Sequence, residues 1–351
     1  MKFTKTNLSG VVLCFIIALA AKLLEYILPF GSIVGTPVFA IIIGLLLAYV
    51  AFPQSFKPGI GFTSKKVLQY SIILLGFSMN LFNVIKVGGQ SLVIILSTIT
   101  VALVTAYVLG YKILKIPTSQ AILVGVGSSI CGGSAIAATA PVIKAEDEGV
   151  ASAISTIFLF NVIAAVIFPT LGNIIGMTDT GFGMWAGTAV NDTSSVVASA
   201  TTWCSMPGHD PNLALDLATI VKLTRTLAII PITFVLALYK TKTDKNSDVQ
   251  FSLKNALPSF IIFFIVASII NTITNSLLAD NETALNAASS LFSFLSSAGK
   301  FMIAMAMAAI GLNTNLVSLV KNGKKPIFLG LIIWVLIAIV SLAVQKATGI
   351  W

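Results

Sequence analysis

Charged residues are scarce in this chain of 351 residues: only 9% are charged, whereas soluble domains carry about 25%. Histidine and arginine occur once each, as His209 and Arg225. Apolar residues are abundant, at 57% of the chain with a mean hydropathy of +1.00. These proportions exclude a soluble globular protein and predict an all-α integral membrane protein, with membrane lipid around it and no room for a separate soluble domain.

Few residues are available for metal binding or catalysis. Cys14, Cys131 and Cys204 are far apart, and His209 lies in a loop that contains Pro and Gly, so we expect no metal site and no cofactor. Neither a Gly-x-Ser-x-Gly elbow nor a nucleotide-binding Gly-x-x-x-x-Gly-Lys-Ser/Thr loop is present. We therefore expect no enzyme, and an intramembrane enzyme is the weakest alternative.

The apolar segments predict about eleven transmembrane helices, the first an uncleaved span over 11–28 rather than a signal peptide. The others are expected at 35–52, 66–85, 90–113, 119–143, 152–175, 183–203, 214–239, 256–276, 288–318 and 326–347. In its last turns the first span carries Lys22 and Glu25, which we expect to pair.

The lysines predict an orientation. The formal charge of +9 could suggest nucleic acid, but the lysines lie in short connections, where they orient a membrane protein, so no nucleic-acid partner is expected. The lysine-rich connections are the even-numbered ones: Lys57, Lys65 and Lys66; Lys112 and Lys115; Lys240, Lys242 and Lys245; Lys321, Lys324 and Lys325. The positive-inside rule therefore predicts the N-terminus in the cytoplasm and the C-terminus outside. The middle connections, such as Lys144 to Glu148, are mixed in charge.

A run of small and hydroxylated residues, 187–200, contains the carboxylate Asp192 within an apolar segment. A carboxylate at membrane depth is costly and is read as functional, with a partner to be identified. Lys222 and Arg225, one segment later, share a helix face and are the expected partners. They could neutralise Asp192, or they could attract an anion while Asp192 carries a coupling ion.

A second run, 127–141, places Gly132 and Gly133 in the middle of an apolar span, flanked by serines. Glycine costs about 1 kcal/mol relative to alanine in a helix, so we expect a broken helix whose half-helix N-terminus favours an anion. Close packing of small residues is the structural alternative. The candidate substrate-binding residues are Ser128, Ser129, Gly132, Gly133, Ser134, Asn191, Thr193, Lys222 and Arg225, with Asp192 in coupling or gating and Asn80, Asn313 and Asn315 as cavity-lining groups.

An internal repeat relates 75–88 to 310–323 without a gap. Gly76, Asn80, Leu81, Lys86 and Gly88 match Gly311, Asn315, Leu316, Lys321 and Gly323. The copies are an odd number of spans apart, which predicts an inverted repeat. We expect one membrane domain, 1–351, with half cores at 66–175 and 183–347. The two glycine- and serine-rich runs do not follow this repeat in a simple way.

The sequence resembles the YeiH-type family of bacterial membrane proteins, whose members are named sulfate exporters. The resemblance rests on 128–144, on 153–161, on Gly187-Thr-Ala with Thr193-Ser, and on Val221 to Arg225, and extends over essentially the whole chain. Members often carry His-Glu where this chain has Asn191-Asp192; the acid is kept and the histidine is not, which argues against a proton relay there. The resemblance implies a transporter in the bacterial cell (inner) membrane with crossed broken helices, as in the bile-acid symporter and sodium/proton antiporter folds.

Together these features predict an inverted-repeat secondary transporter that exports a small inorganic or sulfur-containing anion, such as sulfate, by alternating access. The coupling ion would be H+ or Na+, and a homo-oligomer is compatible with the sequence. The alternative is a sodium- or proton-coupled cation antiporter that uses Asp192.

Overall fold

The computed structural model describes residues 7–28, 35–48, 53–243, 259–278, 281–314 and 324–351, and within these ranges the regular structure is entirely helical. The N-terminal helices are α1 (Leu8–Ile27), α3 (Thr36–Leu47), α4 (Lys57–Phe62), α5 (Leu68–Leu75) and α6 (Leu81–Thr105), with short π-helical segments at Thr63–Val67 and Ala106–Ile113. Next come α7 (Thr118–Ser129), α8 (Gly133–Val142), α9 (Asp147–Ile174), α10 (Asp179–Ala189) and α11 (Thr193–Ser205). The chain continues through α12 (Leu213–Thr226), α13 (Ile229–Thr243), α15 (Ser259–Leu277), α16 (Glu282–Asn313) and α18 (Lys324–Thr348).

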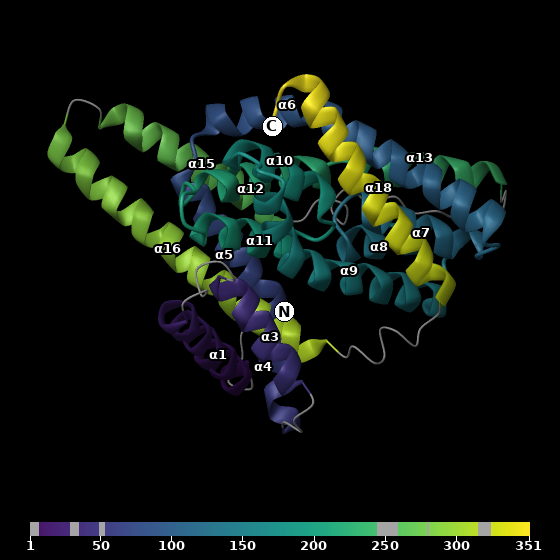
Figure 1. Cartoon of the computed structure of the whole chain (residues 1–351), viewed down its shortest axis with the longest axis horizontal. Helices are drawn as coiled ribbons and strands as arrows, with labels where there is room; N and C mark the ends of the chain where they lie inside the picture. Colours follow the sequence, from purple (N-terminus) through teal and green to yellow (C-terminus); the bar gives the residue numbers. More distant parts are fainter. Residues whose placement is uncertain (1–6, 29–34, 49–52, 244–258, 279–280, 315–323) are drawn as a thin grey trace.

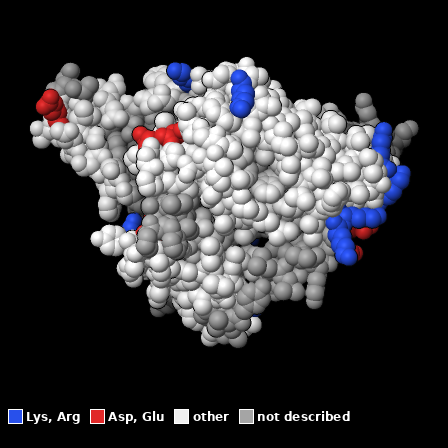
Figure 2. All heavy atoms as spheres, viewed as in Figure 1, with Lys and Arg blue, Asp and Glu red and all other residues white. Residues whose placement is uncertain are grey.

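Seven helical stretches in the described part are long and apolar enough to cross a membrane. They are Leu8–Ile27, Leu81–Ile113, Glu148–Ile174, Leu213–Leu238, Ser259–Leu277, Glu282–Asn313 and Lys324–Thr348. Their outward faces carry exposed aliphatic and aromatic side chains, such as Leu96 and Phe263. The face seen in Figure 2 is largely uncharged: lysines lie mainly along its upper and right-hand edges, and one group of acidic atoms lies within its upper left part. The expected all-α membrane protein is confirmed.

The helices form two bundles (Figure 1). The first, here called the α16 bundle, contains α1, α3, α4, α5, α15 and α16. Its helices approach closely at glycine: a Cβ placed on Gly311 would lie only 2.4 Å from the carbonyl oxygen of Ile41 on α3. The second, the hairpin bundle, contains α6 to α13 and α18. The main contacts between the bundles are the start of α6 against α15, and α11 against α3 and α16.

The first pair of short helices in the hairpin bundle, α7 and α8, folds back on itself. A Cβ on Gly127 in α7 would lie 2.9 Å from Cδ1 of Ile136 in α8, so positions on either side of the 130–132 turn face each other. At the other end, Gly149 at the start of α9 lies beside Gln120 at the start of α7, 3.7 Å between Cβ positions. The segment is a helical hairpin with its tip at 130–132.

The second pair, α10 and α11, does the same. Phe182 on α10 stacks on Trp203 on α11 with ring centroids 4.1 Å apart, and Trp203 Nε1 donates to Asp179 Oδ1 at 2.7 Å. Residues near the start of α10 thus touch residues near the end of α11. The second hairpin has its tip at 190–192.

The hairpins enter from opposite ends of α18. Lys325, at the start of α18, donates to the carbonyl of Leu114 beside the open end of the first hairpin, at 3.0 Å. Trp351, just after α18, accepts from Thr178 Oγ1 at the open end of the second hairpin, at 2.5 Å. Arms of 10–13 residues measure about 15–20 Å, roughly half of a 30 Å hydrocarbon core. The two tips therefore meet near the middle of the molecule.

This corrects the expectation of eleven spans. The expected spans at 119–143 and 183–203 are hairpins that return to the side from which they start, because the breaks at 130–132 and 190–192 reverse the chain. The expected spans at 35–52 and 66–85 are helical but are the short α3 and the interrupted α4–α5. The break at Gly132 and Gly133 was predicted from the residues, but the break at 190–192 was not. The crossed, membrane-spanning broken helices that the resemblance implied are replaced by hairpins.

Two smaller expectations have different outcomes. Glu25 accepts from Thr36 Oγ1, and in the described part of the chain no ion pair within 4 Å joins it to the exposed Lys22, so the expected pair is not formed. In the internal repeat, the Met79 N–H donates to Gly76 O and the Thr314 N–H donates to Gly311 O, at 3.2 and 3.1 Å. Both copies therefore leave their helix in the same way at the same register. Residues 315–323 lie outside the described residues, and the division into half cores stays a prediction.

The hairpin topology predicts which loop positions share a side of the membrane. Single cysteines at Thr118 and Glu148 should react with an impermeant thiol reagent from one side, and those at Thr180 and Pro207 from the other, since these exposed positions flank the two open ends. The measurement is labelling of intact cells against inverted vesicles. Labelling of Thr118→Cys and Glu148→Cys from opposite sides would restore a spanning segment and refute the hairpin.

Candidate functional site at the hairpin tips

The two hairpin tips touch each other. Gly132, at the tip of the first hairpin, has φ +70°, and a Cβ built there would lie 3.4 Å from Cβ of Asp192 at the tip of the second. A left-handed conformation favours glycine, and the close approach leaves little room for a side chain. The N-termini of α8 and α11 and the C-termini of α7 and α10 thus gather at one place.

Lys222 on α12 is completely buried and joins the two tips. Its Nζ donates to Ile130 O at the end of α7, at 2.8 Å, and to Val190 O at the end of α10, at 2.9 Å. The last carbonyls of a helix have no partner within the helix and need one when buried. A single ammonium group satisfies one such carbonyl from each hairpin.

Arg225, one turn further along α12, is also completely buried and does the same with its guanidinium. Its Nε donates to Ser129 O at 2.6 Å and its Nη2 to Ser128 O at 2.8 Å, both at the end of α7. Its Nη1 donates to Thr188 O of α10 at 2.6 Å. Together the two side chains hold five carbonyl oxygens of the two hairpins.

The donors of Lys222 and Arg225 therefore go to backbone carbonyls rather than to Asp192. In the described part of the chain no ion pair within 4 Å joins either cation to that carboxylate. The cause is local: the last turns of two half-helices end beside α12 and present the negative ends of their dipoles. Lys222 and Arg225 therefore do not bind Asp192 directly, contrary to the expectation. They bind backbone carbonyls of the two hairpins, one of which carries Asp192 at its tip.

Asp192 caps α11. Its carboxylate accepts from the backbone N–H of Ser194 at 3.0 Å and from the Ser194 hydroxyl, and the residue is half-buried. An acidic N-cap is favoured by the positive end of the helix dipole. The α8 N-terminus, by contrast, begins at Gly132 with no side-chain cap. One of the two converging N-termini is neutralised and the other is not.

The charges at the tips leave a positive surplus. Each half-helix end carries about half a charge, so the two C-termini and the two N-termini offset each other. With Lys222 and Arg225 protonated and Asp192 ionised, one net positive charge is left. Such a site favours a small anion over a cation.

Polar groups without a partner lie at the same place. Asn191 is 1% exposed, yet neither its Oδ1 nor its Nδ2 has a hydrogen-bond partner among the described residues, and the same is true of Ser128 Oγ. Buried amide and hydroxyl groups are normally hydrogen-bonded, and exceptions require an explanation. A polar solute at the tips would provide partners for these groups.

Asn161 on α9 was not singled out as a site residue. Ile157, one turn earlier, lies 3.0 Å from the Cβ position of Gly127 and 3.5 Å from that of Gly132, so this face of α9 packs on the first hairpin. Asn161 is 3% exposed, and its Oδ1 has no partner among the described residues. An amide within the apolar run 153–165 was the signal that could have identified it.

The remaining candidates are placed as follows. Thr193 is the first residue of α11 and is buried; Gly133 and Ser134 begin α8, where Ser134 is exposed. Asn80 caps α6, accepting from Phe82 N at 2.9 Å, and Asn313 ends α16, 3.5 Å from Ser64 Oγ. No contact in the described part brings either asparagine to the hairpin tips. Asn315 lies outside the described residues.

Comparison with known proteins places the chain in a family. The family described as "Conserved hypothetical protein 698" matches residues 9–330. The chain belongs to this family. A UPF0324 membrane protein of Fusobacterium nucleatum is 53% identical over 349 residues, covering 98% of this chain and 99% of the relative. UPF0324 membrane proteins of Streptococcus pyogenes serotype M18 (53% over 348 residues; 98% of each chain) and Streptococcus agalactiae serotype V (52% over 349; 99% of each) are similarly close. The family resemblance expected from the sequence is confirmed.

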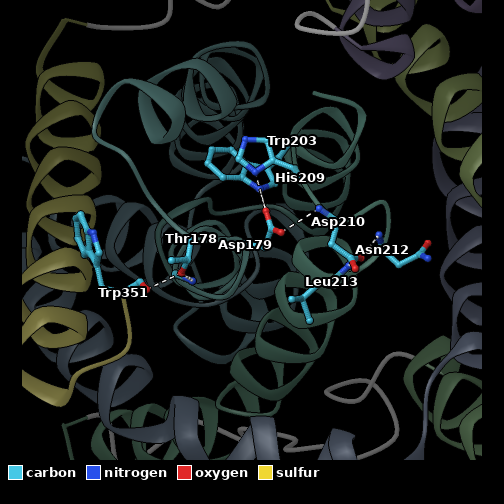
Figure 3. A network of polar contacts seen from close by, with 9 residues as sticks. Thr178, Asp179, Trp203, His209, Asp210, Asn212, Leu213 and Trp351 are labelled. Atoms are coloured by element: carbon cyan, nitrogen blue, oxygen red, sulfur yellow. Dashed lines mark hydrogen bonds and ion pairs between the residues drawn. The ribbon is translucent and has the colours of Figure 1, made fainter. Parts of the chain in front are cut away.

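In this UPF0324 protein, Asp179 fastens the open end of the second hairpin (Figure 3). Its carboxylate accepts from Trp203 Nε1 at 2.7 Å and from Asp210 N at 2.9 Å, and lies 2.8 Å from His209 Nδ1. Asp179 lies outside the seven spanning helices. Burial alone would raise its pKa, but the hydrogen bonds from Asp210, Trp203 and His209 outweigh burial and lower the pKa. The charged carboxylate ties α10, α11 and the following loop together.

The role of Lys222 in holding the tips predicts a loss of stability. Lys222→Met leaves Ile130 O and Val190 O without their donor, and an unsatisfied buried polar group costs about 1–3 kcal/mol. We expect thermal unfolding of the purified protein in detergent, followed by tryptophan fluorescence, to occur several degrees lower. Lys86→Met removes an exposed lysine and is the matched control. Equal melting temperatures for the two variants would contradict the bridging role.

Proposed function

We propose that this UPF0324 protein is a secondary transporter of a small inorganic or sulfur-containing anion such as sulfate, with its binding site at the hairpin tips. The observation that carries the proposal is the meeting of two opposed half-membrane hairpins around buried cations and unpartnered Asn191 and Ser128 groups. Non-helical backbone at membrane depth is tolerated where it is buried in protein or lines a cavity. The uncapped N-terminus of α8 adds N–H groups that suit an anion.

The binding roles divide between two kinds of residue. Lys222 and Arg225 hold the tips and supply the positive field, while Asn191, Ser128, Ser129, Ser134 and Thr193, with the backbone at Gly132 and Gly133, contact the anion. Asp192 is half-buried beside the same place and couples transport to H+ or Na+. The lysine-rich end of α18 faces the cytoplasm of the bacterial cell, with the N-terminus inside and the C-terminus outside.

A cation antiporter is the second candidate. The specific observation in its favour is that Asp192 is the one tip carboxylate in the described part of the chain and is accessible at its surface. Such a protein would bind Na+ or H+ at Asp192 with no need for an anion. The two functions differ in which ion drives a current.

The deciding experiment is current recording from proteoliposomes on a solid-supported membrane. We expect a signal with sulfate, sulfite, thiosulfate or a sulfonate, absent with chloride alone, and lost in Asp192→Asn because coupling fails. Glu282→Gln, which neutralises an exposed carboxylate at the start of α16, should keep the current. Signals driven only by sodium or pH, with silence to every anion, would reject anion transport in favour of the antiporter.

A second variant tests the anion site itself. Asn191→Ala removes two polar atoms that have no partner among the described residues, so it should leave the melting temperature within about 1 °C of the unchanged protein. It should raise the anion concentration for half-maximal current roughly 10-fold, as expected for the loss of about 1.4 kcal/mol of binding. An unchanged anion concentration for half-maximal current would show that Asn191 does not contact the anion, whatever the size of the current.

A further inference from the structure

One face of α11 carries hydroxyl groups along its length. Ser195, Ser199 and Thr202 are four and three residues apart, so they share one side of the helix, running from the hairpin tip towards its open end. All three are buried, at 5%, 0% and 2% exposure. The opposite side packs on α12, where Cys204 meets the backbone of Ala214 and Leu215.

At Thr202 the hydroxyl face lies at the seam between the two bundles. A Cβ built on Gly35, the N-cap of α3, would be 2.8 Å from Thr202 Oγ1, and α11 also packs on α16. Yet Ser199 Oγ and Thr202 Oγ1 have no hydrogen-bond partner among the described residues. These two buried hydroxyl groups therefore carry a desolvation cost that alanine at the same positions would avoid.

The first hairpin shows the opposite state. On α8, Ser134, Ala137 and Pro141 recur at spacings of three and four and are exposed. The main neighbours of α8 are α7, α9 and α13, which leave this face open from the tip towards the open end. One hairpin therefore presents an open small-residue face, and the other presents a closed one with unpaired hydroxyls.

We propose that the seam between α11 and helices α3 and α16 opens as a second water-filled route to the hairpin tips, and that Ser199 and Thr202 hydrogen-bond the anion as it passes. The inference rests on the proposed transport function. In the state described here the unpartnered polar groups at the tips are buried, and the α8 face beside them, from Ser134 onward, is exposed; in the alternative state the tips are reached along α11. The hydroxyls find their partners, water and solute, in that second state.

Lys300 holds the seam closed at its mouth. It lies on α16, and its Nζ donates to Pro211 O at 3.0 Å and to Asn212 Oδ1 at 2.6 Å in the loop that follows α11. These bonds join the two bundles directly. Removing the ammonium group should favour the open seam.

The test measures the reactivity of single cysteines, with the native Cys14, Cys131 and Cys204 replaced by alanine and correct folding verified by monodisperse elution. Ser199→Cys and Thr202→Cys are compared with Ala200→Cys, which is equally buried but about 140° around the axis from Ser195. An impermeant thiosulfonate is applied to each side of membrane vesicles. Because a minor state is populated at roughly 0.1–10%, we expect slow labelling of positions 199 and 202 from the Pro207 side, at least 10-fold faster than at 200.

Adding Lys300→Ala should increase labelling at 199 and 202 several-fold and leave 200 unchanged, and sulfate should slow it. Rates at 199 and 202 no higher than at 200, with or without Lys300→Ala, would overturn the proposal, as would labelling from the Thr118 side alone. The result is separable from the transport assay. Labelling without any anion-driven current or sulfate protection would leave a water route and reject the anion contacts; anion current without labelling would reject the seam.

Discussion

The arrangement depends on one set of hydrogen bonds: Lys222 and Arg225 filling the carbonyl ends of two half-helices. A helix that stops in the middle of a membrane protein leaves its last carbonyls without water, and five of these oxygens are satisfied by two side chains one turn apart. Without these two side chains, the carbonyl groups at the tips 130–132 and 190–192 would be buried without hydrogen-bond donors. The same bonds explain how two charged side chains can be buried, since the negative ends of the helix dipoles offset part of the free-energy cost of burying them.

Once the two tips are held together, the binding properties of the site depend on the polar groups there that have no partner. The carbonyl ends are satisfied and Asp192 caps one N-terminus. Among the described residues at the tips, the side chains without a partner are Asn191 and Ser128, and the α8 N-terminus has no capping side chain. These groups are polar and small and lie in a positive field. A solute that binds there must be compact and accept hydrogen bonds, which is why an anion is the proposed cargo.

The sequence predicted the break at Gly132 and Gly133 because glycine disfavours a helix, and it predicted the importance of Asp192, Lys222 and Arg225 because burying a charged side chain is costly. It could not predict the direction of the chain after each break: a spanning broken helix and a hairpin have the same composition and differ only in contacts such as Phe182 with Trp203. The partners of Lys222 and Arg225 were also predicted wrongly. A sequence shows the charge of Asp192, but it does not show which backbone carbonyls lie at the end of a helix. Two hairpins in place of two spans leave the predicted sides of the termini unchanged, so the lysine pattern could not reveal the error.

The position of α12 in the chain imposes an order on assembly. Both hairpins are synthesised before α12, and their arms are too short to be held in a bilayer as independent spans. Until Lys222 and Arg225 have been synthesised, the carbonyl groups at the tips lack their hydrogen-bond donors. The contact between the two tips can therefore be completed only after α12 has been synthesised, although both hairpins precede it in the chain.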